Sequence, residues 1–256
     1  MSVYIAAAAY ADVEMHDGGF LARELRRADD FIRYGALAIL ALQRRLPGKT
    51  GQFEDHCGLF LGTAHGPMTT TFRVLDQMLA EDPVSPTLFS QSLFNAAAGQ
   101  LAQIFRLLGP AFTVTDFAFP FFQSLQQACC ALESGAVSTC LVLQVESYSP
   151  LLVDAGSKDD PAAAPLPPGA CALLLAGRPA SSKSWHIDKF RLNLQQASPH
   201  TLLHEHESMT INDATYHRGS LGNCRQLIDC IVSSKISGLD VRLQAEYGEV
   251  ELRLSL

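Results

Sequence analysis

The segment from Gly109 to Glu146, GPAFTVTDFAFPFFQSLQQACCALESGAVSTCLVLQVE, carries the pattern around which the rest of the chain is organised. It predicts a strand over 112–115, an aromatic turn, a buried helix over 122–134 and a second strand over 139–145. A strand that turns sharply into a buried helix is a common mount for a nucleophile, because the helix dipole favours an anion at the helix N-terminus. The turn itself, DFAFP at 116–120, contains no Ser, Cys or Thr. The segment therefore has the outline of a nucleophile elbow without a nucleophile.

The composition indicates a globular protein that binds neither nucleic acid nor a membrane core. The chain has 256 residues, 48% of them apolar, and a formal net charge of −7, so it lacks the basic surface that nonspecific nucleic-acid binding needs. Its apolar runs are too short to span a bilayer, and Met1–Ala11 lacks the basic region of a secretory signal. Seven cysteines without CxxC spacing favour reduced, buried thiols. We therefore expect a cytoplasmic protein.

Outward from the opening segment, apolar strand patterns alternate with helical ones. Strands are predicted over 3–9, 57–63, 170–176 and 185–194, helices over 29–45, 69–80, 93–107 and 224–234, and a terminal hairpin over 240–245 and 249–256. Residues 82–92 are predicted to form a loop, and residues 147–168 a mobile excursion rich in Pro and Ala. Residues 195–217 show no clear pattern. Mostly apolar strands between helices indicate an α/β layered domain with both sheet faces covered.

Four segments, in this order, resemble the N-terminal half of a β-ketoacyl synthase, the condensing enzyme of fatty-acid and polyketide assembly. They are GLFLGTAHG (58–66), VSPTLFSQSLFNAAAGQLAQIFRLLGPAFTV (84–114), QSLQQACCALESGAVSTCLVLQVE (123–146) and PGACALLLAG (168–177). The resemblance implies an α/β, thiolase-like layered fold. It also implies a ketosynthase N-terminal-like domain over 1–180 and an abbreviated C-terminal portion, 181–256, packed on the same core.

The resemblance places Ala118 where the family's acyl-accepting cysteine would stand, so no catalytic residue is assigned. Cys129 and Cys130 lie about three helical turns further on and are interpreted as helix core. His217 lies near one of the family's active-site histidines and is a candidate vestige of that site. The Thr that follows this histidine in the family is replaced by Arg218.

The aromatic residues of the elbow are the other candidates. Alternation of Phe117, Phe119 and Phe121 predicts that all three point to one side of an extended turn. In the family the strand matching 112–115 pairs with its copy in a partner subunit, and the elbow lies near the dimer interface. The resemblance therefore makes the following residues candidates for an acyl tunnel or a dimer interface: Phe112, Phe117, Ala118, Phe119, Phe121 and Phe122.

Two other groups of residues suggest chemistry less specifically. His200, His204, His206 and Glu207 have spacings seen in zinc sites, but their polar surroundings favour solvated loop histidines. The RELRRADDFIR run (23–33) could dock an acidic carrier protein, although interleaved Arg and Asp are more typical of a solvated helix start. No metal or cofactor is expected.

A synthase-like half without its nucleophile is similar to the chain-length factors of type II polyketide and aryl-polyene systems. The resemblance implies a catalytically inactive subunit that pairs with an active ketosynthase, shapes its acyl tunnel and meets an acyl carrier protein through the complex. One alternative is a stand-alone acyl-thioester hydrolase or transferase that uses another nucleophile or a base such as His65 or His217. Another is a homodimeric scaffold that binds acyl chains.

Overall fold

The structure is a computed structural model that describes residues 2–16, 18–46, 52–54, 56–153, 168–181, 184–195, 208–212, 214–216, 219–233, 236–245 and 248–256. Its strands are β1 (Tyr4–Asp12), β2 (Gly58–Thr63), β3 (Ala111–Thr115), β4 (Thr139–Glu146), β5 (Gly169–Ala176), β6 (Trp185–Leu194), β7 (Ser208–Ile211), β8 (Ala214–Tyr216), β9 (Gly238–Ala245) and β10 (Gly248–Ser255). Its helices are α1 (Asp30–Gln43), α2 (Met68–Leu79), α3 (Pro86–Gln91), α4 (Ala96–Phe105), α5 (Pro120–Glu133) and α7 (Gly219–Ser233).

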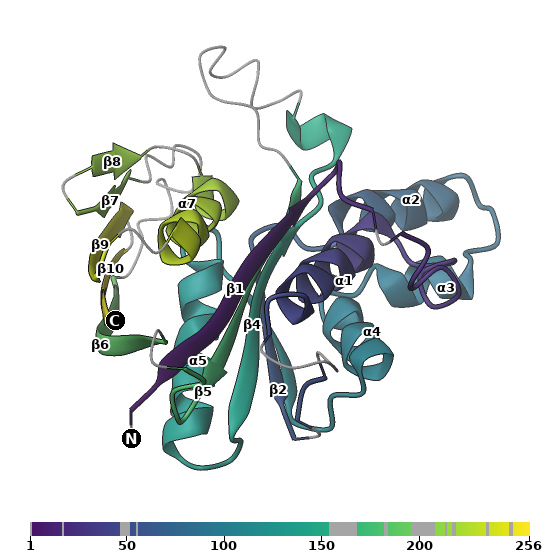
Figure 1. The fold of residues 1–256 in the computed structure, drawn as a ribbon. Helices are drawn as coiled ribbons and strands as arrows, with labels where there is room; N and C mark the ends of the chain where they lie inside the picture. Colours follow the sequence, from purple (N-terminus) through teal and green to yellow (C-terminus); the bar gives the residue numbers. More distant parts are fainter. Residues whose placement is uncertain are drawn as a thin grey trace.

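The ten strands that the structure describes belong to one sheet, in the order β3-β2-β4-β5-β1-β6-β10-β9-β7-β8. Strands β3, β2 and β4 are parallel, and the remaining neighbours are antiparallel. We call β3-β2-β4-β5-β1 the N-terminal arm and β6-β10-β9-β7-β8 the C-terminal arm. The arms meet where β1 pairs with β6, at Tyr4–His186 and Ile5–Trp185. The sheet curves between the arms, so that α5 and α7 lie inside the bend (Figure 1).

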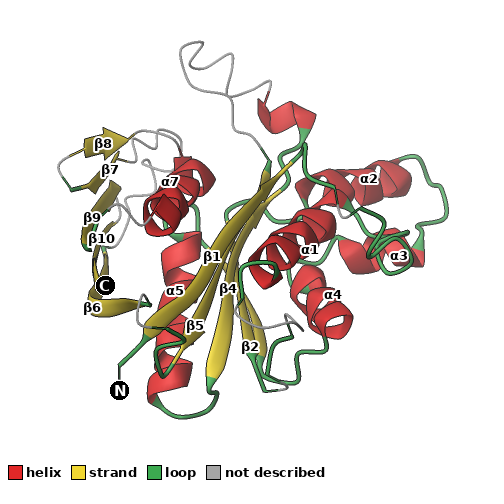
Figure 2. Cartoon of the chain, viewed as in Figure 1, coloured by secondary structure: helices red, strands yellow, loops and turns green. Residues whose placement is uncertain are grey.

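Each face of the N-terminal arm is covered by helices, which confirms the predicted α/β layered class (Figure 2). On one face α1 and α4 bury an apolar cluster against β1, β2, β4 and β5. On the other face α5 and α7 form a second cluster that includes inward side chains of β9 and β10 as well. The indole Nε1 of Trp185 donates to the Ile231 carbonyl oxygen of α7 at 3.1 Å, which ties β6 to that helix. The second core thus contains residues from both arms.

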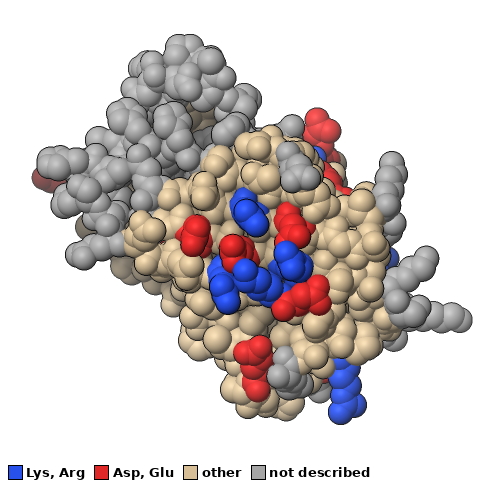
Figure 3. Space-filling model, turned by 90° about the vertical axis from the view of Figure 1, so that its left-hand side faces the viewer, with Lys and Arg blue, Asp and Glu red and all other residues tan. Residues whose placement is uncertain are grey.

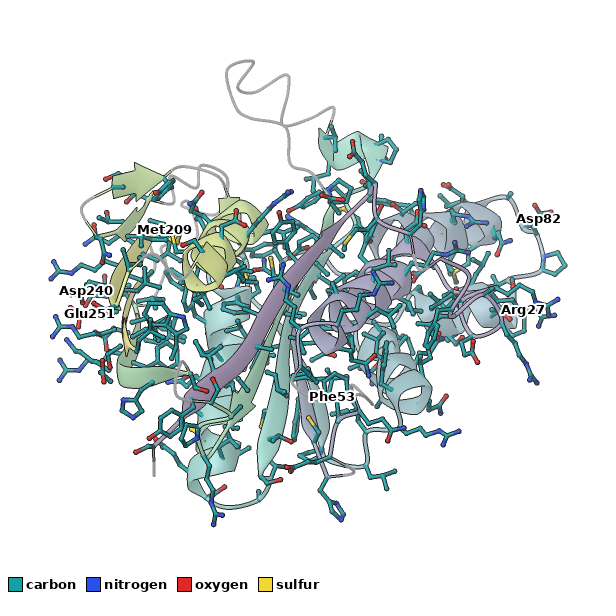
Figure 4. The ribbon with its side chains drawn as sticks, viewed as in Figure 1. Arg27, Phe53, Asp82, Met209, Asp240 and Glu251 are labelled. Carbon is teal, nitrogen blue, oxygen red and sulfur yellow. The ribbon has the colours of Figure 1, made fainter. Side chains whose placement is uncertain are left out.

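The outer face of the C-terminal arm is polar. Leu239, Val241 and Leu243 of β9 are buried, whereas the side chains between them face outward, and β10 alternates in the same way. Lys, Arg, Asp and Glu are interspersed over this face, and Asp240 and Glu251 lie on the outer side of β9 and β10 (Figures 3 and 4). Among the described residues, no helix is both long and apolar enough to cross a membrane.

Most predicted elements are present within a few residues of their expected bounds. The predicted loop at 82–92 contains a short helix, α3, which begins after Ser85 because the Ser85 hydroxyl accepts from the Leu88 N–H at 3.4 Å. Within the unassigned stretch, β7 and β8 are described. The histidines at 200, 204, 206 and 217, most of the 147–168 excursion and Tyr247 of the hairpin turn lie outside the described residues.

Candidate functional site at the α5 elbow

The elbow forms where the carboxyl ends of the parallel strands β3, β2 and β4 meet the N-terminus of α5. Gly62 of β2 lies directly beneath this helix end. A Cβ at Gly62 would overlap the carbonyl oxygen of Pro120 and come within 2.8 Å of Ser124 Oγ. Pro120 begins α5, where the fixed φ angle of proline suits the helical backbone. The absence of a side chain at Gly62 therefore allows α5 to begin directly on the sheet.

Asp116 organises the turn between β3 and α5. Its Oδ1 accepts hydrogen bonds from the backbone N–H groups of Ala118 at 2.9 Å and Phe119 at 2.7 Å. Its Oδ2 accepts from Gln123 Nε2 at 3.1 Å. A carboxylate in this position satisfies amide donors that precede the helix and complements the positive end of the helix dipole. The Asp116 carboxylate thus occupies the position at the N-terminus of α5 that favours an anion.

Ala118 is buried in this turn, with 1% of its surface exposed. Its methyl group cannot accept an acyl group or exchange a proton. The nearest thiols along α5 are Cys129, which is buried, and Cys130, which is exposed. Burial raises the pKa of Cys129 to about 12, so this thiol remains protonated at neutral pH. The expectation that the cysteines are buried is wrong for Cys130.

The aromatic residues of the elbow divide into two groups. Phe119, Phe121 and Phe122 are at most 2% exposed and belong to the core shared by both arms, whereas Phe112 and Phe117 are 54% and 53% exposed. The predicted common orientation of Phe117, Phe119 and Phe121 is therefore wrong. The reason is that Asp116 folds residues 116–119 into a turn and Pro120 starts a helix, so no extended segment exists to produce the alternation.

A buried carboxylate, Glu146, holds the neighbouring turn after β2. It accepts from Thr63 Oγ1 at 3.1 Å, from the N–H groups of Ala64 and His65 at 2.6 and 3.2 Å, and from Gln144 Nε2 at 3.4 Å. Complete burial raises the pKa of Glu146 to about 7, although these four hydrogen bonds favour the ionised form. Glu146 therefore anchors the turn that carries His65.

His65 packs between two aromatic rings at the surface. Its ring centroid lies 5.9 Å from that of Phe117 and 5.6 Å from that of Tyr148. Burial lowers the pKa of this imidazole, which favours the neutral form. The contacts shown for the ring are aromatic, so its surroundings resemble a packing site more than the hydrogen-bonded setting of a general base.

The sequence analysis missed a group of exposed apolar residues beside the elbow. Phe89, Leu93 and Phe94 are between 44% and 52% exposed. A Cβ placed on Gly66 would come within 2.5 Å of the Phe94 ring, so this ring lies against the turn that also carries His65. The signal was available, because SPTLFSQSLFN places four large apolar residues in a stretch that was predicted to be mainly a loop.

Among the described residues, one further group of reactive side chains lies on the outer face of the C-terminal arm. On the outer face, Ser255 Oγ donates to Asp188 Oδ1 at 3.0 Å and His186 Nδ1 lies 2.8 Å from the same oxygen. The hydroxyl therefore bonds the carboxylate, whereas an activated serine would bond the imidazole. Within the part of the chain that the structure describes, no three His, Cys, Asp or Glu side chains are grouped as metal ligands would be.

Solved structures similar to this chain include ketosynthases and chain-length factors. The complex of a type II polyketide acyl-carrier protein with its hexaketide-bound ketosynthase (AntDE:AntF) aligns with a TM-score of 0.73 at 12% identity, over 99% of each chain. The complex of a ketosynthase (ApeO) with its chain length factor (ApeC) from Xenorhabdus doucetiae aligns with a TM-score of 0.65 at 14% identity, over 100% of each chain.

The ishigamide ketosynthase/chain length factor aligns with a TM-score of 0.63 at 16% identity, over 76% of this chain and 68% of the other. The TM-scores show a common fold, and at these low identities the similarity shows the fold alone. No curated protein matches the chain. A family model described as the β-ketoacyl synthase N-terminal domain matches residues 33–228, from α1 into α7 and thus more than half of the chain. The chain therefore belongs to the β-ketoacyl synthase family, as the resemblance in its sequence predicted.

Proposed function

We propose that this chain is a catalytically inactive, ketosynthase-like subunit, a chain-length factor that pairs with an active β-ketoacyl synthase. The observation that carries the proposal is Ala118, a methyl group at the buried elbow where a condensing enzyme of this fold requires a nucleophile. The similarity to structures of ketosynthases with chain-length factors supports the same assignment. A partner subunit would supply the thiol that this chain lacks.

The exposed edge of the N-terminal arm is the proposed contact with that partner. Strand β3 ends the sheet, so the backbone groups along its outer edge have no strand partner among the residues that the structure describes. Such an edge is a template for pairing with another strand. The half-exposed rings of Phe112 and Phe117 lie on or beside it, and Phe112 stacks on Phe60 at 5.6 Å. The half-exposed ring of Phe94 lies against Gly66, in the turn that carries His65, and the His65 ring in turn contacts Phe117.

The three buried rings of the elbow are the proposed floor of the acyl tunnel. Phe119, Phe121 and Phe122 are packed by the chain's own atoms, so a hydrocarbon chain arriving from the partner would end against a filled core. Each methylene group excluded from an apolar cavity costs about 0.8 kcal/mol of burial free energy. A rigid floor would therefore limit the number of extension cycles. The products would belong to fatty-acid, polyketide or aryl-polyene assembly.

In this proposal the acyl carrier protein meets the complex as a whole, the complex is cytoplasmic, and His217 is a vestige of an active-site histidine. The alternative, a stand-alone hydrolase or transferase, requires a nucleophile and a base in contact. His65 packs against rings, and Ser255 bonds a carboxylate. These contacts favour the non-condensing subunit over the enzyme.

Co-expression with a ketosynthase encoded nearby tests the proposal. We expect a stable 1:1 heterodimer by native mass spectrometry, and acylation of the ketosynthase alone after incubation with acyl-carrier thioesters. Phe112→Asp and Phe117→Asp should weaken the heterodimer, whereas Leu256→Asp, a change at another half-exposed apolar residue that follows β10, should not. An obligate homodimer that ignores every neighbouring ketosynthase would refute the assignment.

Within the heterodimer, Phe121→Leu should lengthen the product. Unchanged product length with intact assembly would show that Phe121 is not part of the tunnel floor.

A further inference from the structure

The turn that lacks a nucleophile also contains a carboxylate at the N-terminus of α5, where the helix dipole is positive. Asp116 Oδ1 bonds the amide N–H groups of residues 118 and 119, and no other amide donors lie closer to the Ala118 side chain along the backbone. In an active site of this outline, such amides would face the developing negative charge of the reaction. Here an anion that belongs to the chain occupies them.

We infer that Asp116 closes the elbow to anionic chemistry, so that replacing Ala118 with cysteine would not by itself restore a reactive thiolate. The inference deepens the proposed function, on which it rests. No amide donor is left at residue 118 to polarise a thioester carbonyl. The subunit therefore contacts an acyl group only through the hydrocarbon part of that group. Both the alanine at 118 and the aspartate at 116 then separate this chain from a condensing enzyme.

The geometry sets the sign of the effect. Asp116 Oδ1 lies 2.9 Å from the Ala118 N atom, and standard backbone dimensions place the Ala118 Cβ within about 5.5 Å of that oxygen. A C–S bond adds about 1.8 Å, so a thiolate built on this Cβ would lie within about 7 Å of a like charge, which disfavours its ionisation. A shift of one pKa unit corresponds to a tenfold smaller thiolate fraction. We expect a shift of about one to two units.

The carboxylate is also held in place. Gln123, one turn into α5, donates to Asp116 Oδ2, so the second oxygen has its own partner. Turning the carboxylate away from residue 118 would break all three hydrogen bonds at once. Residue 120 is proline and offers no N–H as a substitute donor. The anion is therefore a fixed part of the elbow.

The test compares Ala118→Cys with the double variant Asp116→Asn/Ala118→Cys, each in the full chain. Cysteine labelled with ¹³C at Cβ reports ionisation by NMR without requiring a reagent to reach the buried site, and the new resonance is assigned by difference from the parent. We expect the thiol of Ala118→Cys to titrate above the ordinary value of about 8.5, and the double variant to titrate at least one unit lower. The rate of alkylation at residue 118, resolved by peptide mass spectrometry, should rise about tenfold at pH 7.5.

A matched control removes the Gln123 side chain but keeps the charge of Asp116. Gln123→Ala combined with Ala118→Cys should leave the thiol at its raised pKa, because Asp116 still faces it. Should Asp116→Asn unfold the protein, Asp116→Ser keeps a short capping oxygen and serves the same comparison. Equal titration midpoints in the single and double variants, or a lowered midpoint in Ala118→Cys alone, would overturn the inference. Neither result would affect heterodimer formation, which tests the proposed function separately.

Discussion

At the scale of single residues, Gly62 decides how closely α5 can approach the sheet. Its α5-facing position is occupied by the Pro120 carbonyl and the Ser124 side chain, so even a methyl group has no space. The obstacle is backbone, which cannot rotate away as a flexible side chain could. The whole elbow, including Asp116 and the buried phenylalanines, therefore depends on a glycine that lies more than fifty residues earlier in the sequence.

Gly62→Ala should lower the free energy of unfolding by about 2–3 kcal/mol or more, because overpacking here displaces the start of a helix. Gly99 of α4 provides the matched control, since a Cβ at that position meets no atom within 4 Å. Gly99→Ala should be neutral or stabilising by up to about 1 kcal/mol. Urea denaturation followed by circular dichroism measures both. A Gly62→Ala variant as stable as the parent would contradict this account of the elbow.

At the scale of elements, oppositely charged side chains pair across neighbouring strands on the outer face of the C-terminal arm. Glu251 of β10 stands opposite Arg191 of β6 and Arg242 of β9, and its carboxylate also bonds Lys189. The hydrogen bond from Lys189 and these cations lower the pKa of Glu251. Arg253 bonds Asp240 at 2.9 Å in the next row. Cross-strand pairing of opposite charges keeps this face hydrated and favours the observed register.

Reversing one charge tests this order. Glu251→Lys should lower the unfolding midpoint, because the new cation faces three others, and the loss should shrink as salt is added. Glu249→Lys is the matched control, since Glu249 lies on the same strand and face but opposite the neutral Asn193 and Gln244. Thermal unfolding at low and high salt distinguishes the two variants. Similar losses in both would mean that the ladder contributes no specific electrostatic stability.

Elements with a strong local pattern were predictable from the sequence, and those set by distant contacts were not. The apolar run at 139–145 predicted β4, and apolar residues at helical spacing predicted the helix at 29–45, which the structure shows as α1 with Asp29 as its N-cap, its Oδ1 3.0 Å from the Ile32 N atom. Ala118 lies in the turn before α5, as the predicted order of strand, turn and helix required, and its equivalence to the family's cysteine stays a prediction. The orientation of Phe117 was not predictable, because it depends on the Asp116 side chain. The exposed ring of Phe94 depends equally on a neighbour, Gly66, which is remote in sequence.

At the scale of the whole molecule, two arms share one core although their strands barely meet. The sheet joins them through only two residue pairs of β1 and β6, whereas α7 contacts both arms. Ser220 Oγ of α7 accepts from Gln144 of β4 at 2.9 Å, and further along the helix the Ile231 carbonyl accepts from Trp185 of β6. The expected division near residue 180 lies between β5 and β6 in the sequence. It therefore separates the two arms of a single sheet. Burial around α5 and α7, more than strand pairing, should therefore hold the arms together.

We predict that the two arms unfold as one cooperative unit. Trp185 is the only tryptophan in the chain and lies at the joint, so its fluorescence reports the contact between the arms, whereas far-ultraviolet circular dichroism reports the secondary structure of the whole chain. The two urea transitions should coincide. Leu227→Ala, which truncates a fully buried side chain of α7, should move both midpoints equally and cost about 2–5 kcal/mol. A fluorescence transition that precedes the loss of dichroism would show that the C-terminal arm detaches first, and that residues 181–256 form a separately folding portion.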